Sequence, residues 1–220
     1  MNVFDILIEY HQGFLQGLRV TLELCLIIWG TGIIIGTALG VAAANDQGLG
    51  RFVQGGAFVL AAVPMLVFLF WLHYPAQAMF DVVIDPFYTA AFTLSIVNMF
   101  MIAEMVRQAV RDFPKQYITA GRVCGLSQQD LVLKIQLPLL FRQLLPGYLT
   151  AQVGMLHATL FASLISVEEI FRVAQRINAS IYKPVEIYTA LGVFFLLVCL
   201  PVNGFAAWLK YKYTRNMSEH

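Results

Sequence analysis

Residues 103–146 read AEMVRQAVRDFPKQYITAGRVCGLSQQDLVLKIQLPLLFRQLLP, and this stretch decides the fold. It is the only long segment that is not apolar, and a hydrophobic half of the chain lies on each side of it. It carries six of the fourteen Lys and Arg residues: Arg107, Arg111, Lys115, Arg122, Lys134 and Arg142. A basic, helical interruption between apolar halves indicates a cytoplasmic loop that contacts another protein.

The composition is that of a membrane protein. The 220 residues are 59% hydrophobic and 12% charged, whereas soluble domains carry about 25% charged residues. The mean hydropathy is +0.72, so much of the surface must face lipid. Three scattered cysteines (Cys25, Cys124 and Cys199) indicate packing residues and neither a disulfide framework nor a metal site.

Apolar runs predict an all-α membrane protein with five transmembrane helices, since a span needs about 20 apolar residues. The runs are 18–44, 52–74, 86–110, 147–167 and 187–209. With the N-terminus outside and the C-terminus cytoplasmic, ten of the fourteen basic residues fall on the inner side. A four-span alternative, with 147–167 as a buried soluble helix, breaks this charge pattern.

Local patterns predict how the spans pack and bend. Gly32, Gly36 and Gly40 recur every four residues and predict a face that another helix approaches closely. Pro64 should break or kink the second span, and apolar spacing within 166–186 predicts a further helix along the outer mouth. Residues 1–16 suit an interfacial amphipathic helix, the alternative being a frayed tail, and 216–220 would form a cytoplasmic tail.

Within the loop, 119–123 can open a helix, and Gly125 can end it or allow a sharp change of direction. Ser127 can cap a second short helix over 127–134, which Pro138 should stop. Leu126, Leu131, Val132 and Ile135 would supply its apolar anchors. The alternative, a solvated linker, predicts no buried apolar face.

The loop resembles that of permease subunits of ABC importers, in the polar-amino-acid (histidine, glutamine and glutamate) uptake branch. Their Glu-Ala-Ala, Gly and Ile-x-Leu-Pro pattern is similar to Thr119-Ala120-Gly121, Gly125 and Ile135, Leu137, Pro138 here. Ala103-Glu104 with Arg107, and Pro114, match what this branch places upstream, and 157–163 is similar to its Lys-Asp-Thr-Ser-Leu-Ala-Ser stretch. The resemblance covers nearly the whole chain.

The resemblance implies a type I ABC importer permease-like fold: one permease domain over 17–215 with a cytoplasmic coupling loop at 111–146, in the bacterial inner membrane. It also implies a cytoplasmic ABC ATPase dimer and a periplasmic or extracellular substrate-binding protein as partners, a small polar substrate, and no nucleic acid. The coupling residues would be Thr119, Ala120, Gly121, Gly125, Leu126, Ser127, Leu131, Ile135, Leu137 and Pro138. The chain has no GxxxxGK[ST] loop, so ATP and Mg would be bound by the ATPase and this subunit would be non-catalytic, without a cofactor.

Three departures from the family pattern remove polarity. Thr119 replaces the acid of the loop, His157-Ala158 replaces Lys-Asp, and Ala62-Val63-Pro64 stands where relatives often read Arg-Gly-Thr-Pro. A homodimer would have to supply the whole substrate site from such a chain. We therefore expect a heterodimer with a second permease that carries more of the substrate contacts.

Polar residues within spans are the candidates for the substrate pathway, because they are costly in lipid. They are Asn98, Glu104, His157, Thr159 and Ser163, with Glu23 a weaker candidate near the outer interface. Simpler alternatives stay open: a Glu104–Arg107 ion pair, hydroxyls bonded to their own helix, and a packed imidazole. The sequence contains no cluster of residues typical of a metal site or a catalytic site. Two alternative functions stay open: a stand-alone channel or secondary carrier, and a membrane enzyme or scaffold.

Overall fold

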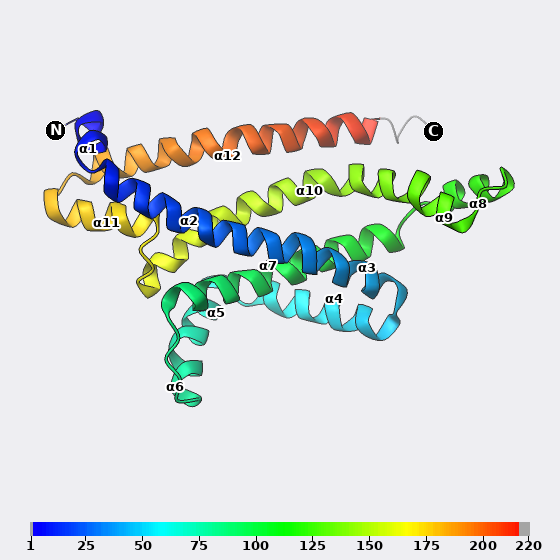
Figure 1. The fold of residues 1–220 in the computed structure, drawn as a ribbon, viewed down its shortest axis with the longest axis horizontal. Coiled ribbons are helices and arrows are strands. Elements are labelled where there is room, and N and C mark those ends of the chain that lie inside the picture. Colours follow the sequence, from blue (N-terminus) through cyan, green and yellow to red (C-terminus); the bar gives the residue numbers. More distant parts are fainter. Residues whose placement is uncertain (1, 216–220) are drawn as a thin grey trace.

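The computed structural model describes residues 2–215, and within that range every regular element is a helix (Figure 1). The first long helix combines α2 His11–Thr31, the π-helical turn η1 Gly32–Gly36 and α3 Thr37–Asn45. Then follow α4 Gln47–Ala62, α5 Met65–Trp71, η2 Leu72–Ala76, α6 Gln77–Met79 and α7 Pro86–Arg111. The second half contains α8 Lys115–Val123, α9 Gln128–Asp130, η3 Leu131–Gln136, α10 Leu137–Ala158, the 3₁₀ segment η4 Thr159–Ile165, α11 Ile170–Ile181 and α12 Pro184–Arg215.

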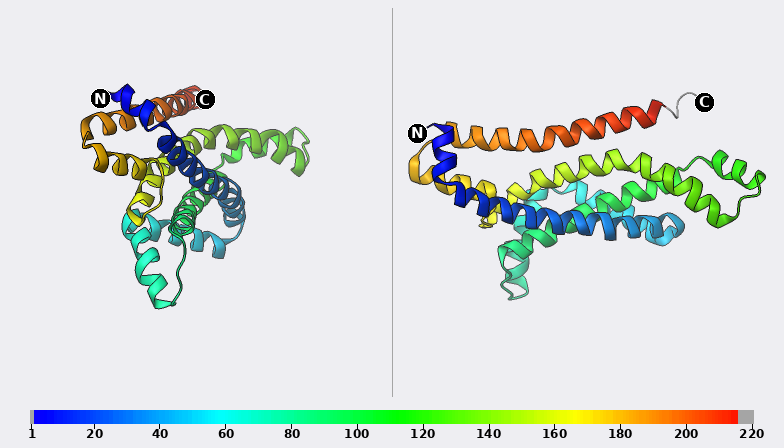
Figure 2. Two further views of the ribbon diagram at one scale, coloured as in Figure 1. Left: turned by 60° about the vertical axis from the view of Figure 1, so that its left-hand side comes forward. Right: turned by 45° about the horizontal axis from the view of Figure 1, so that its top comes forward.

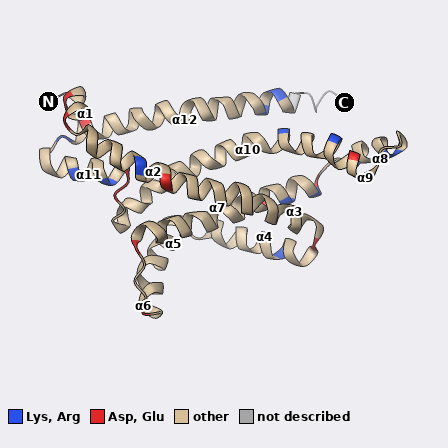
Figure 3. Ribbon diagram, viewed as in Figure 1, with Lys and Arg blue, Asp and Glu red and all other residues tan. Residues whose placement is uncertain are grey.

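The long helices run along a common direction, and the molecule has two distinct ends (Figure 1). The N-terminus and α11 lie at one end, called here the α11 end. The segment containing α8 and α9 lies at the other, the loop end, where α12 also finishes. Basic residues mark the loop-end portions of α10 and α12 (Figure 3). The positive-inside rule would place this end in the cytoplasm, and the sidedness stays a prediction.

Within residues 2–215, four helices are long and apolar enough to span a membrane, and a bent pair makes a fifth candidate. That pair corresponds to the predicted second span, in which α4 and the helix Met65–Met79 meet at 96°. The break predicted at Pro64 is confirmed: Val63 is extended (φ −89°, ψ 126°), as expected of a residue before proline. Figures 1 and 2 show α5 and α6 leaving the bundle, so residues 52–74 are not one straight helix.

The predicted glycine face is confirmed as a close helix contact. A Cβ added to Gly36 would lie 2.8 Å from the carbonyl oxygen of Met99, and one added to Gly40 would lie 2.5 Å from that of Ala103. Both partners belong to α7, so the backbones of the first long helix and α7 pack without intervening side chains. Close packing of helix backbones at small residues is a main cause of helix association in lipid.

The helix predicted within 166–186 is confirmed as α11, and its apolar face is buried. Its side chains Ile170, Val173, Ala174 and Ile177 pack in one cluster with Ile6 and Ile187, joining the two chain-terminal helices at the α11 end. Glu169 caps α11 by accepting hydrogen bonds from the N–H groups of Phe171 (2.9 Å) and Arg172 (2.8 Å). Burial raises the pKa of the Glu169 carboxyl to about 7, and the two N–H donors oppose the rise.

The N-terminal segment predicted as one helix over 1–16 is divided at Tyr10, between α1 Val3–Glu9 and α2. Its location on a membrane surface stays a prediction. The predicted tail 216–220 lies outside the described residues.

Substituting Gly36 by Ala should destabilise the protein by about 1–3 kcal/mol, because the new methyl group forces α7 away from the first long helix. Gly30 is the matched control in the same helix, since nothing lies within 4 Å of its added Cβ. Thermal unfolding of the purified protein in detergent should show a lower midpoint for G36A and an equal or higher one for G30A, because alanine favours a helix interior over glycine. Equal midpoints would contradict the described contact.

Candidate functional site

The first candidate site is the loop between α7 and α10, where α8 ends in a Schellman motif. Gly125 has φ +75°, a conformation that glycine adopts readily and other residues rarely do. Its N–H bonds to the carbonyl of Arg122 (3.0 Å), and the N–H of Leu126 bonds to that of Gly121 (3.1 Å). The change of direction predicted at Gly125 is therefore confirmed.

The two arms of the loop meet at Gly121. A Cβ added there would lie 2.3 Å from Leu131 Cδ2 and 3.2 Å from Ile135 Cδ1. Gly121 and Leu131 are both buried, so α8 is fastened to the start of the next helix by an apolar joint. This packing contradicts the alternative prediction, in which the loop is a solvated linker without a buried apolar face.

The second helix begins as predicted, with the Ser127 hydroxyl accepting from the N–H of Asp130 at 3.1 Å. The prediction that Pro138 stops this helix is wrong. The chain stays helical from Gln128 to Ile165, because η3 is a π-helical segment and the N–H of Leu137 bonds to the carbonyl of Val132, five residues earlier. This wider turn accommodates a proline that would clash in a regular α-helix.

The loop projects beyond the other helices at the loop end (Figure 1). It also exposes apolar side chains. Val123 is 83% exposed and Leu133 is 63% exposed. Thr119, Ala120 and Pro138 are also exposed, and so is Leu137. The predicted coupling residues thus divide into a buried joint (Gly121 and Leu131) and an accessible surface around it.

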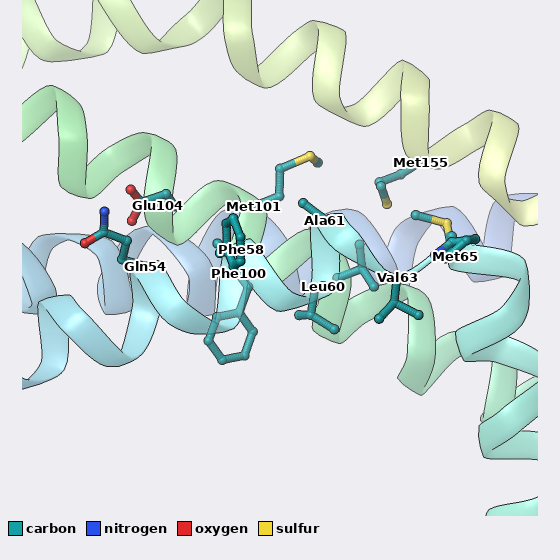
Figure 4. A pocket seen from close by; sticks show the side chains of 13 residues that line it. Gln54, Phe58, Leu60, Ala61, Val63, Met65, Phe100, Met101, Glu104 and Met155 are labelled. Carbon is teal, nitrogen blue, oxygen red and sulfur yellow. The ribbon is translucent and has the colours of Figure 1, made fainter.

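The second candidate site is a groove of about 670 Å³ beside α7. Its walls come from α4, the Val63–Pro64 break, α7 and Met155 of α10 (Figure 4). Most lining side chains are apolar; the polar ones are Gln54 and Glu104, which lie at the same end in Figure 4. This groove is called the α4–α7 groove below.

Of the five predicted pathway residues, only Glu104 lines this groove. Its carboxylate accepts from Arg107 Nε (2.7 Å), from the second Arg107 nitrogen (2.6 Å) and from Gln108 Nε2 (2.7 Å). Arg107 is only 6% exposed. The ion pair proposed as the simpler alternative is present, and Glu104 neutralises a buried guanidinium.

Asn98 lies inside the bundle and is 0% exposed. Its Nδ2 donates to the carbonyl of Ile28 (2.8 Å) and to Gln152 Oε1 (3.1 Å). The amide therefore joins α2, α7 and α10 and does not face the α4–α7 groove.

The remaining three candidates also lie away from the groove. Thr159 and Ser163 are buried and donate to the carbonyls of Leu156 and Leu160, each at 2.7 Å, so both hydroxyls bond their own helix. His157 is exposed and contacts the Phe195 ring edge-on, with centroids 6.1 Å apart.

The apolar lining of the groove was not predicted. Phe58, Met65, Met101 and Met155 contribute to it, but an apolar residue in a membrane span gives no sign of whether it faces lipid, protein or a groove. Besides Glu104, which was predicted, Gln54 was an available signal, because it is an uncharged polar residue inside a predicted span.

Comparison with known proteins now fixes the family. The model of the family described as "Binding-protein-dependent transport system inner membrane component" matches residues 32–215. This chain belongs to that family. The resemblance noted from the loop motif is thereby confirmed, as is an inner-membrane location.

Two curated relatives match this permease over most of their length. The glutamine transport system permease protein GlnP of Escherichia coli (strain K12) is 30% identical over 196 residues, covering 86% of this chain and 87% of GlnP. The histidine/lysine/arginine/ornithine transport system permease protein HisQ of Salmonella typhimurium is 26% identical over 211 residues, covering 91% of this chain and 92% of HisQ.

Solved structures support the permease fold. A crystal structure of an amino acid ABC transporter with histidines superposes with a TM-score of 0.82 at 19% identity, covering 96% of this chain and 99% of that one. An inward-facing MetNI methionine ABC transporter gives 0.72 at 17% identity, covering 93% and 98%.

Replacing Glu104 by Gln should destabilise the permease by about 3–5 kcal/mol, because it leaves the buried Arg107 guanidinium without a carboxylate. The control is E23Q, which breaks the Arg19–Glu23 pair; those side chains are 81% and 44% exposed, and an exposed pair contributes about 0–1 kcal/mol. Thermal unfolding compares the two. A stable E104Q variant that has lost transport would instead assign Glu104 to the substrate pathway.

Proposed function

We propose that this permease is the transmembrane subunit of an ATP-driven importer of amino acids, coupled to a cytoplasmic ATPase through residues 119–138. The supporting observation is the loop: a projecting tip with exposed Val123 and Leu133, fastened by the Gly121–Leu131 joint to a helix that continues to Ile165. Exposed apolar side chains outside a bilayer mark interaction sites. The ATPase pair would bind this surface, and an external binding protein would deliver the substrate.

The substrate class rests on the relatives. GlnP and HisQ are named for transport of glutamine and of histidine, lysine, arginine and ornithine. The α4–α7 groove is the site we propose for passage, since it follows α7 from Val97 to Glu104 and holds the polar side chains of Gln54 and Glu104.

We further propose that the importer is a heterodimer of two permeases. The groove is almost entirely apolar on this side, and its Glu104 carboxylate already accepts three hydrogen bonds from Arg107 and Gln108. Beyond the Gln54 amide, a polar amino acid would need more donors and acceptors than this half offers. A companion permease facing the groove would supply them.

Replacing Val123 by Glu should abolish co-purification of the ATPase, because a charge would lie within an apolar contact. At 83% exposure, Val123 can accept the change without loss of folding. We expect at least a tenfold loss of bound ATPase (about 1.4 kcal/mol or more). V83E is the control: Val83 is fully exposed in the α6–α7 connection, away from the loop. A V123E complex that keeps its ATPase and its transport activity would reject the proposed contact, whereas a wild-type protein that purifies and transports without any ATPase would favour a carrier working alone.

The subunit composition is tested separately by isolating the intact complex from its native membrane and identifying each chain by mass spectrometry. We expect two different permeases in equal amounts. Finding this chain as the only permease would exclude the heterodimer while leaving the ATPase contact untouched.

A further inference from the structure

A second groove, of about 800 Å³, opens between α10 and α12 toward the loop end. It is distinct from the α4–α7 groove, although Met101 of α7 contributes to both. Its volume is within the range of about 300–1,000 Å³ that small-molecule sites occupy.

The two walls present one face of each helix. Arg142, Pro146 and Thr150 follow at four-residue spacing on α10, and Asn203, Ala207 and Lys210 follow on α12. The helices run in opposite directions, since α10 starts at the loop end and α12 finishes there (Figure 1). Arg142 and Lys210 therefore lie at the same end of the groove, while Gly147, Ala151 and Ala207 line its middle, and the uncharged polar residues Thr150 and Asn203 lie at its deeper end.

No described residue neutralises either cation. Within the part of the chain that the structure describes, no ion pair or hydrogen bond joins Arg142 or Lys210 to another residue, whereas Lys134 and Arg176 have carboxylate partners at 2.6 Å. The groove thus combines two free positive charges at its mouth with an uncharged interior that is mostly small and apolar. This pattern is complementary to an anionic phospholipid, which has a phosphate at the membrane surface and an acyl chain beneath it.

We propose that the α10–α12 groove binds one anionic phospholipid, with its phosphate between Arg142 and Lys210 and an acyl chain along Gly147, Ala151 and Ala207. Lysine and arginine at the end of a span hold such headgroups by charge, and small residues leave room for the chain. Because the chain is an inner membrane component, this ligand is always available to it. The inference does not depend on the identity of the transported substrate.

The test uses the intact complex reconstituted in nanodiscs made of phosphatidylethanolamine with a minority of phosphatidylglycerol, then released for native mass spectrometry. The wild-type protein should retain phosphatidylglycerol above its share of the bilayer. We expect about a fivefold loss for R142Q or K210Q and more than tenfold for the double variant. The matched control R51Q/K212Q removes the same two charges from exposed positions outside the groove and should retain as much phosphatidylglycerol as the wild type.

A second measurement identifies the occupant directly. A photo-crosslinking amino acid replaces Ala207, and the mass of the adduct is determined after irradiation in native membranes. A phospholipid adduct that becomes weaker in R142Q/K210Q supports the proposal. A polypeptide adduct would overturn it and make the groove a subunit interface, and equal phosphatidylglycerol retention in all variants would overturn it as well.

Discussion

The architecture depends on one amide buried in the middle of the bundle. Asn98 donates from α7 to the backbone of α2 at Ile28 and to Gln152 of α10, and the Trp29 indole donates to the carbonyl of Gln152 at 3.1 Å. In a bilayer, apolar contact alone does little to bring helices together, so hydrogen bonds and close backbone packing decide which helices meet. A Cβ at Gly32 would lie 2.1 Å from Asn98 Nδ2; the glycine therefore makes room for the amide, and the two residues fix three helices at one point.

This fixed point leaves the opposite side of α7 to form grooves. The first long helix covers one face of α7 through Gly36 and Gly40. On the other face, the break at Pro64 turns α5 away, and the concavities lined by Met101 open between α4, α10 and α12. The same proline that interrupts a span thus exposes the surface on which a substrate or a second permease would act. Irregular backbone in membranes is tolerated where it lines such a cavity.

Local chemistry made much of the fold predictable from the sequence. Gly125 and Ser127 specify a helix end and a helix start through their own backbone and hydroxyl preferences, and both were located correctly. The Gly32, Gly36 and Gly40 spacing likewise identified a packing face.

The prediction at Pro138 failed because the effect of a proline depends on the turn that precedes it. A π-helical segment accommodates this proline, and no residue type in that turn indicates a π-helix. The groove could not be predicted, because it is formed by side chains from α4, α7 and α10 that only the tertiary structure brings together. Asn98 shows the same limit, since its partners are 70 and 54 residues away.

The error at Pro138 changes how the loop can act. A helix that stopped there would be a separate knob, free to move independently of the spans. Instead, Leu131 lies in the buried joint with Gly121 and also in the first turns of a helix that continues to Ile165. A force applied to α8 by a bound protein therefore acts directly on α10.

Gln152 on the same helix accepts hydrogen bonds from Asn98 and Trp29, so α10 is held near its middle. Displacement of the loop end of α10 would therefore rotate the helix about this hydrogen-bonded point. Met155, which lines the α4–α7 groove, lies beyond that point along α10, so movement of the loop would alter the groove wall without any contact between the bound protein and the groove.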